Sequence, residues 1–259
     1  MKLSIYTMIL PRLEVFFLEE WIEHNLKLGV DTIHIYDNGL TPASEARPSH
    51  YYEKVLRPTY EKLPESEKMY KTDRRPCSDY FTDYTDTQIY DKLNSIEDKY
   101  DEVNIVPWRY GIEHTIVHPI SQKRGYANCV KNNESDWWLH CDIDEYFILK
   151  KHENFKELIG DDPDVSCFHF YQRRFHFRER NKSVREIYEC KKDFHLKDPK
   201  TLIDNKIYQF GIHKSCTRGG RTKTFRTDEV AYFHHYLLGN VNPLECDDLV
   251  LDYTIKKYL

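Results

Sequence analysis

Three carboxylates stand close together in the segment Asp142-Ile143-Asp144-Glu145, directly after the aromatic and apolar run from Trp137 to Cys141. The apolar run predicts an interior strand, so the carboxylates fall where that strand ends and the chain turns. Two carboxylates at i and i+2 in such a turn can converge on one divalent cation, and Mg²⁺ or Mn²⁺ prefers these oxygen ligands. A bound cation neutralises the charge that develops on a diphosphate leaving group. We therefore interpret Asp142 and Asp144 as metal ligands, against the alternative of a solvated acidic turn.

Polar residues just before this motif could hold the rest of a nucleotide. Lys123 and Arg124 lie in a polar stretch, 121–133, that predicts a helix leading to the acidic motif. Both cations suit a diphosphate, and Arg can contact it through two hydrogen bonds. Gln122 could bind a base or ribose. The alternative is that all three side chains are ordinary solvated residues.

The elements that must position these residues begin with a β-α-β unit. Leu3 to Ile9 predicts a strand, the apolar stripe after Pro11 predicts a helix that stops at Gly29, and Thr32 to Tyr36 predicts a second strand. Short links between them favour a parallel pair. Ligands bind beyond the carboxyl ends of such strands, which is where Asp37 and Asn38 lie. The alternative for Asp-Asn-Gly is a plain turn.

The remaining chain continues as one domain without a dividing linker. Residues 40–100 are polar and rich in Pro and Tyr, which indicates an insertion of short helices. Further strands are predicted at Val103 to Pro107, Val165 to Phe170, Val184 to Tyr188, Ile207 to Ile212 and Val230 to Leu237. We expect a single domain over 1–259. Residues 1–150 would be the nucleotide-sugar-binding half, and residues 151–259 the acceptor-side half.

A family resemblance rests on three separated segments. Glu20 to Val30, Ile35 to Asn38 and Trp137 to Phe147 resemble the pattern of glycosyltransferase family 92 and related family-2-like enzymes. The resemblance implies the GT-A (Rossmann-like) α/β fold, with a mostly parallel central sheet flanked by helices, and here a mainly β C-terminal part. It implies a nucleotide-sugar-dependent, usually inverting transferase, galactosyl transfer being the best-known activity.

The resemblance also carries residue roles. It implies that Asp142 and Asp144 form the metal and diphosphate motif, and Asp37 resembles the carboxylate that contacts uracil or ribose in GT-A enzymes. The chain is more similar to the soluble glycosyltransferase domains of bacteria and large algal DNA viruses than to eukaryotic members with a signal anchor.

Two roles are assigned among the late residues. A late His is a third metal ligand in several GT-A enzymes, and the His-Tyr ending of the family's pattern makes His235 the first choice, ahead of His213 and His234. A hydrogen-bonded structural His is the alternative for each. An inverting transferase needs a carboxylate base, for which we select Asp228, with Glu229 in reserve, against a solvated turn.

Composition excludes several classes of protein. The 259 residues carry a formal charge of −5, which gives no global attraction to nucleic acid or anionic lipid. No apolar run reaches the ~18 residues of a membrane span, and the N-terminus lacks the features of a signal peptide. Seven Cys without a CxxC pair indicate reduced thiols. We expect a cytoplasmic protein.

These observations together predict an enzyme. The expected activity is transfer of a hexose, with galactose as best guess, from a UDP-sugar to a glycan hydroxyl on an oligosaccharide or glycoprotein. The cofactor would be Mn²⁺ (or Mg²⁺). Two alternatives stay open: a metal-dependent phosphohydrolase, and a non-enzymatic carbohydrate- or nucleic-acid-binding module with the tyrosines as stacking platforms.

Overall fold

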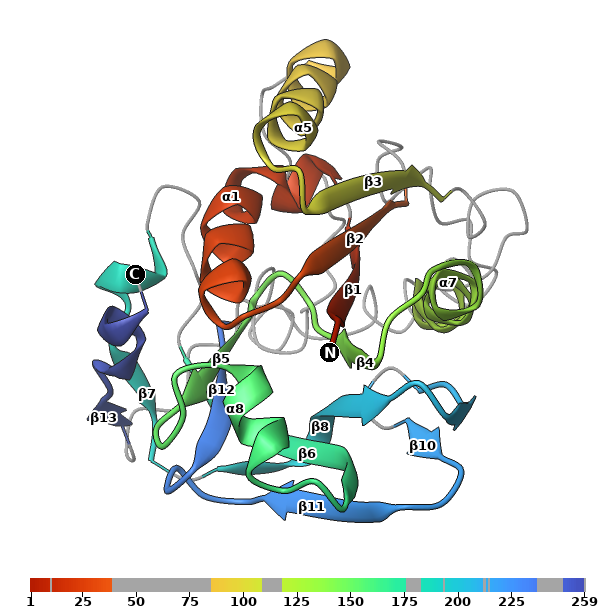
Figure 1. Ribbon diagram of the computed structural model, residues 1–259. Coiled ribbons are helices and arrows are strands. Elements are labelled where there is room, and N and C mark those ends of the chain that lie inside the picture. Colours follow the sequence, from red (N-terminus) through yellow and green to blue (C-terminus); the bar gives the residue numbers. More distant parts are fainter. Residues whose placement is uncertain are drawn as a thin grey trace, which may run out of the picture.

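The computed structural model in Figure 1 describes residues 1–9, 11–38, 85–108, 118–175, 183–192, 194–211, 213, 215–236 and 249–258. Its first part alternates strands and helices: β1 (Leu3–Ile9), α1 (Pro11–Lys27), β2 (Thr32–Asp37), α5 (Asp86–Lys99), β3 (Val103–Pro107), α7 (His118–Asn132) and β4 (Trp137–His140). The second part is mainly strands: β5 (Glu145–Leu149), α8 (Phe155–Gly160), β6 (Val165–Arg174), β7 (Glu189–Lys191), β8 (His195–Asp204), β9 (Ile207–Gln209), β10 (Cys216–Thr217), β11 (Arg221–Phe225), β12 (Ala231–His235) and β13 (Leu249–Leu251). Two short 3-10 helices span Val184–Glu186 and Thr254–Lys257.

A central sheet organises the molecule, with the strand order β3-β2-β1-β4-β8-β6-β12-β5 and β11 beside β6. The first four strands are parallel, as the β-α-β prediction requires. Antiparallel pairing enters with β8, which lies between β4 and β6, and returns where β12 pairs with β5. The mixed α/β fold with a mostly parallel centre and a mainly β C-terminal part is therefore confirmed.

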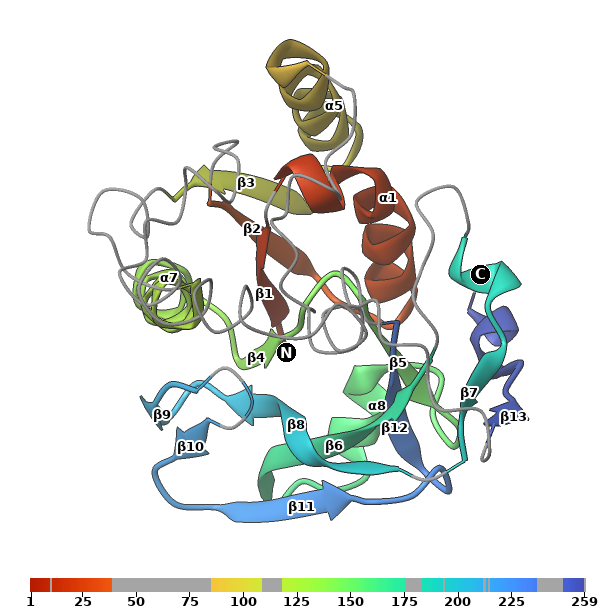
Figure 2. The same ribbon diagram turned by 180° about the vertical axis from the view of Figure 1, so that it is seen from behind.

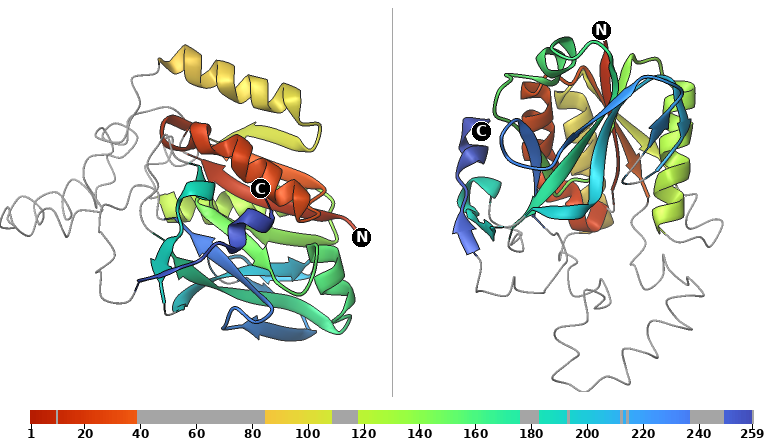
Figure 3. Two further views of the ribbon diagram at one scale, coloured as in Figure 1. Left: turned by 90° about the vertical axis from the view of Figure 1, so that its left-hand side faces the viewer. Right: turned by 90° about the horizontal axis from the view of Figure 1, so that it is seen from below.

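Helices cover the sheet from both sides, α1 on one face and α7 on the other, as the right-hand view of Figure 3 shows. The α1 face is mainly aliphatic, because Ile5, Ile33 and Leu139 pack with α1 in one large core. The α7 face is aromatic and includes Tyr6 and Trp138. Figure 2 shows the same sheet from behind, with the β9–β10 ribbon beyond the end of β8.

Two glycines explain local geometry. Gly29 follows α1 with a φ of 82°, a left-handed conformation that glycine adopts without strain, and this confirms the predicted helix stop. Gly125 lies where α7 crosses β1, and a Cβ atom there would stand 2.4 Å from the hydroxyl of Tyr6. The missing side chain lets the helix approach the sheet closely enough for the Tyr6 hydroxyl to donate to the carbonyl of Gln122 at 2.9 Å.

Most predicted strands are present with shifted ends, and one prediction was wrong. Residues Val184–Glu186 form a 3-10 helix instead of a strand, because the Ser183 side chain caps it and the Glu186 carboxylate accepts a hydrogen bond from the Ser183 backbone N–H. Sequence patterns did not indicate β5, β8 and β11, whose sequences lack a simple alternation, or the short strands β7, β10 and β13. Of the expected insertion at 40–100, residues 40–84 lie outside the described part, and α5 supplies the helix that was expected there. Among the described helices, none is both long and apolar enough to cross a membrane.

Candidate functional site

The acidic motif lies at the carboxyl end of β4, where it meets a buried lysine from β8. The Lys200 ammonium lies 2.5 Å from an Asp142 oxygen and 2.9 Å from a Glu145 oxygen. Lys200 is fully buried, and Glu145 also accepts a hydrogen bond of 2.9 Å from the Asp142 backbone N–H. These contacts close the turn between β4 and β5 around one ammonium group.

Helix α1 holds β5 in place from the side opposite β12. The indole N–H of Trp21 donates to the carbonyl of Glu145 at 3.1 Å, and the Nε2 of His24 lies 3.0 Å from the carbonyl of Phe147. Burial lowers the pKa of His24 to about 3, so the ring is neutral and can donate through one nitrogen. The apolar stripe that predicted α1 therefore also positions Glu145.

The end of β12 supplies a histidine that completes the cluster. Antiparallel pairing sets His235 directly opposite Glu145, so both side chains project from the same face. His235 Nε2 lies 3.3 Å from an Asp144 oxygen, and its Nδ1 donates to the Gln172 side-chain oxygen at 2.6 Å. A hydrogen bond at Nδ1 fixes the ring and directs Nε2 into the cluster, which is how metal-binding histidines are oriented.

Three side chains of this cluster could hold one cation. Ligand atoms of Asp144, Glu145 and His235 lie within 4.8 Å of one another, about twice the length of a metal–oxygen bond. Two carboxylates with an imidazole suit Mn²⁺ better than Mg²⁺, which prefers oxygen ligands only. The structure thus brings together two of the three predicted metal ligands, Asp144 and His235. Asp142 lies outside this group of three and, like Glu145, contacts Lys200.

The pKa values of the two carboxylates that contact Lys200 are shifted in opposite directions. Burial would raise the pKa of Asp142, but Lys200 and His140 outweigh it and hold this pKa well below its usual range. Burial raises the pKa of Glu145, although Lys200 opposes the shift. Lys200 stays charged because Asp142 and Glu145 outweigh burial and raise its pKa. One ammonium therefore contacts the carboxylates of both Asp142 and Glu145.

Polar residues predicted to bind a nucleotide form a row beside the cluster. Gln122, on the first turns of α7, donates to the second oxygen of Asp142 at 3.0 Å. Asn38 is buried and accepts a weak hydrogen bond from Ser121 at 3.5 Å. Asp37 is buried too, and its carbonyl accepts the Trp108 N–H at 2.7 Å. These residues follow β2 and β4 or begin α7, so they share the carboxyl edge of the sheet.

The remaining predicted residues are not among the three candidate cation ligands. Lys123 and Arg124 are exposed on α7. His234 points to the opposite face of the sheet from His235, as alternation along a strand requires, and contacts Tyr236 and Asp252. His213 is 47% exposed, and its Nε2 lies 3.8 Å from Asp198.

The structure does not bring the expected base to this cluster. Asp228 precedes β12, and its carboxylate pairs with Lys150 at 3.0 Å and with Arg173 at 3.6 Å. Lys150 directly follows β5, so the pair lies at the end of that strand opposite to Glu145. Glu229 is exposed beside it. Asp228 was selected because it lies next to a late strand in the sequence. It precedes β12, however, whereas the cluster lies at the other end of that strand, where His235 is.

From the sequence, no role at the site was assigned to Lys200, Gln172 or Glu145, although the family resemblance continues weakly through Lys200. Lys200 lies in a polar strand, and a Lys in such a strand is predicted to be exposed to solvent unless its carboxylate partners are known. Gln172 acts through His235, and nothing local distinguishes it. The closest signal was Glu145 itself, a third carboxylate behind an apolar strand, which needs a buried cation as its partner.

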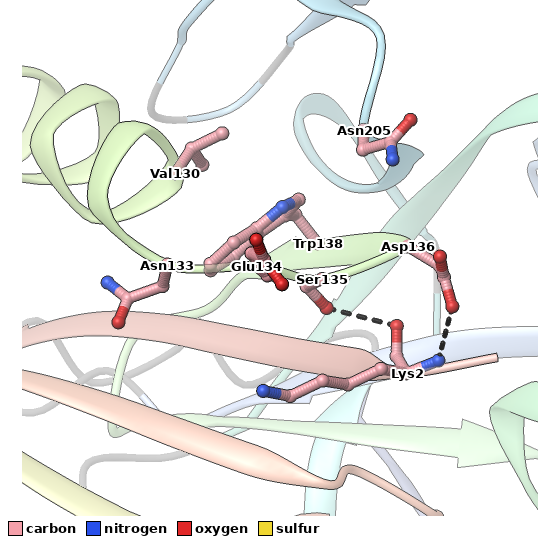
Figure 4. Close-up of a pocket in the computed structure, with 8 residues that line it drawn as sticks. All are labelled: Lys2, Val130, Asn133, Glu134, Ser135, Asp136, Trp138 and Asn205. Atoms are coloured by element: carbon pink, nitrogen blue, oxygen red, sulfur yellow. Dashed lines mark hydrogen bonds between the residues drawn. The ribbon is translucent and has the colours of Figure 1, made fainter.

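A hollow of about 600 Å³ lies at the opposite, amino edge of β1 and β4, lined among others by Lys2, Trp138 and Asn205 (Figure 4). The Lys2 backbone N–H donates to Asp136 at 2.6 Å, and Ser135 donates to the Lys2 carbonyl at 3.0 Å. These bonds fasten the start of β1 to the loop before β4. The hollow is separate from the acidic cluster, which lies at the carboxyl edge.

Comparisons with known proteins gave weak structural similarities. No protein-family model and no curated protein matches the chain. Residues 1–349 of S. aureus TarS superpose with a TM-score of 0.40 at 11% identity, over 91% of this chain and 60% of that chain. The same TarS fragment in complex with UDP-GlcNAc gives 0.40 at 12% identity, over 90% and 58%. Glucosyl-3-phosphoglycerate synthase from Mycobacterium tuberculosis gives 0.35 at 10% identity, over 82% and 61%. This chain spans about 60% of the length of these chains, and the function proposed below rests on the cluster instead.

Proposed function

We propose that this chain is a metal-dependent glycosyltransferase that moves a hexose from a UDP-sugar to a glycan hydroxyl with inversion. The observation that carries the proposal is the meeting of Asp144, Glu145 and His235 within 4.8 Å beside the carboxyl end of β4, where the parallel part of the sheet ends. In sheets of this kind, ligands bind at that edge. Galactose is the first donor sugar to test, following the sequence resemblance.

The residues divide into a cation side and a nucleotide side. Asp144, Glu145 and His235 would hold Mn²⁺, which when bound neutralises charge on the diphosphate leaving group. Gln122 fixes Asp142 from the α7 side, and the pair would contact the nucleotide together with the buried Asp37 and Asn38. Lys200 adds a fixed positive charge that holds Asp142 and Glu145 in place without a cation.

Calorimetry with UDP tests the binding half of the proposal. UDP should bind in Mn²⁺ and lose at least tenfold in affinity in EDTA, because Asp142 and Asp144 cannot attract a diphosphate unless a cation bridges them. Equal affinity in both buffers would contradict a metal-bridged site. Asp162→Asn is a matched control, since this acidic residue pairs with Arg221 and Lys223 away from the cluster.

The transfer half needs a donor panel of UDP-galactose, UDP-glucose and UDP-GlcNAc with Mn²⁺ and mixed oligosaccharide acceptors. We expect UDP release with one donor, and an inverted anomeric configuration in the product. Asp142→Ala and Asp144→Ala should lose this release and keep the fold. Phosphate release from a model phosphoester, without UDP release from any donor, would favour the phosphohydrolase instead.

A further inference from the structure

An acidic residue of β8, two positions before Lys200, has an unusual backbone conformation. Asp198 adopts a φ of 53°, the left-handed region that residues other than glycine seldom enter. It lies on β8 two residues before Lys200, next to the point where pairing between β6 and β8 shifts register. Such backbone strain persists where surrounding contacts enforce it, and it concentrates at functional sites.

Contacts tie Asp198 to the cation side of the cluster. The Gln172 side-chain N–H donates to the Asp198 carbonyl at 3.4 Å, while the Gln172 oxygen accepts from His235. One glutamine therefore sets both the metal-facing imidazole and the backbone that carries Asp198. The Nε2 of His213 lies 3.8 Å from the Asp198 carboxylate. Burial lowers the pKa of His213, and the positive charge of Lys200 lowers it further.

Exposure separates Asp198 from the other carboxylates. Asp142 and Glu145 both contact the buried Lys200, and Asp144 faces His235. The Asp198 side chain is 49% exposed and its neighbour His213 is 47% exposed, so an incoming hydroxyl can reach the pair from solvent. A base for the acceptor must be accessible in this way while the leaving group is held on the cation side.

We infer that Asp198, beside His213, is the catalytic base that takes the proton of the acceptor hydroxyl, an assignment that rests on the proposed function. As the proton passes to the Asp198 carboxylate, the hydroxyl oxygen forms the new bond to the anomeric carbon. The bond from that carbon to the diphosphate breaks, and its electron pair leaves with the nucleoside diphosphate. Asp198 afterwards returns the proton to solvent. This role replaces the one that the sequence suggested for Asp228.

The test uses UDP release from the active UDP-hexose of the donor panel, with water as the acceptor. Asp198→Asn keeps size and tolerates the left-handed backbone, yet it should lower release by about 100-fold or more, the usual contribution of a general base. Its UDP affinity in Mn²⁺ should stay within twofold of the natural chain. Asp161→Asn is the matched control, because it breaks a remote aspartate–histidine pair with His152 and should not change release.

Azide separates a base from a structural residue. Asp198→Gly removes the carboxylate, leaves room, and suits a φ of 53°. Azide is an anionic nucleophile that needs no deprotonation, so it should restore UDP release and yield a glycosyl azide. Two results would overturn the assignment of Asp198 and leave the proposed function standing. One is UDP release by Asp198→Asn at the rate of the natural chain. The other is no response of Asp198→Gly to azide while UDP still binds. Failure of the natural chain to bind UDP in Mn²⁺ would overturn the proposed function with it.

Discussion

Lys200→Met would remove the charge around which the candidate site is built. Met nearly matches the length of Lys and suits a fully buried position, so packing is kept and the ammonium alone is lost. Asp142 keeps its hydrogen bond from Gln122 at 3.0 Å and is partly exposed, whereas the side chain of Glu145 is 3% exposed. The cost therefore falls mainly on Glu145, which is left as a buried carboxylate without its cation.

The expected loss in the free energy of unfolding is about 3–5 kcal/mol at pH 7.5, the cost of removing one partner from a buried ion pair. The loss should shrink as the pH falls. Lys200 keeps the pKa of Asp142 low, so its stabilising effect is present above about 3.9, the unfolded value, and is lost below it. The pKa of Glu145 is already raised, and without Lys200 it rises further, so neutral Glu145 costs the variant little below about pH 4.3.

Urea unfolding at pH 7.5 and pH 4 measures both effects. Adding Glu145→Gln to Lys200→Met should recover at least half of the loss, because the uncompensated charge is removed. Lys150→Met is the control. Its ion pair with Asp228 is partly exposed and should cost no more than about 1 kcal/mol, with no comparable recovery at low pH. Equal urea midpoints for Lys200→Met and the natural chain at pH 7.5 would refute the reasoning.

Three further perturbations test other parts of the structure. Asp144→Asn should weaken Mn²⁺ binding at least tenfold in calorimetry while the urea midpoint stays near that of the natural chain; unchanged affinity would remove Asp144 from the site. Asp252→Asn should cost about 3 kcal/mol at pH 7, because the buried carboxylate pairs with Arg173 at 2.8 Å and with His234. His234 holds the pKa of Asp252 low against burial, so this loss should fade below about pH 4 and a pH-independent loss would contradict the account. Gly125→Ala should lower the thermal midpoint by overpacking against Tyr6, at a cost of about 1–3 kcal/mol, and an unchanged midpoint would show that α7 can shift.

Local sequence determined the elements of the first half and the edge at which a ligand would bind. The apolar run of β1, the stripe of α1 and the stop at Gly29 each follow from interactions within a few residues, so their bounds could be predicted closely. The strand ends that carry Asp37 and Asp142 share one edge because consecutive strands joined by helices run parallel. Propensity and periodicity are local properties, and a β-α-β unit uses little else.

Tertiary structure alone decided which residues meet at that edge. Lys200 reaches Asp142 across 58 positions of sequence, and Gln172 reaches His235 across 63. Both contacts depend on β8 and β12 being inserted beside β6, an order that no local pattern specifies. For the same reason Asp228, which looked favourable next to a late strand, pairs instead with Lys150 at the far end of β5. Strand order sets which charges become neighbours, and burial then decides whether such a charge must find a partner.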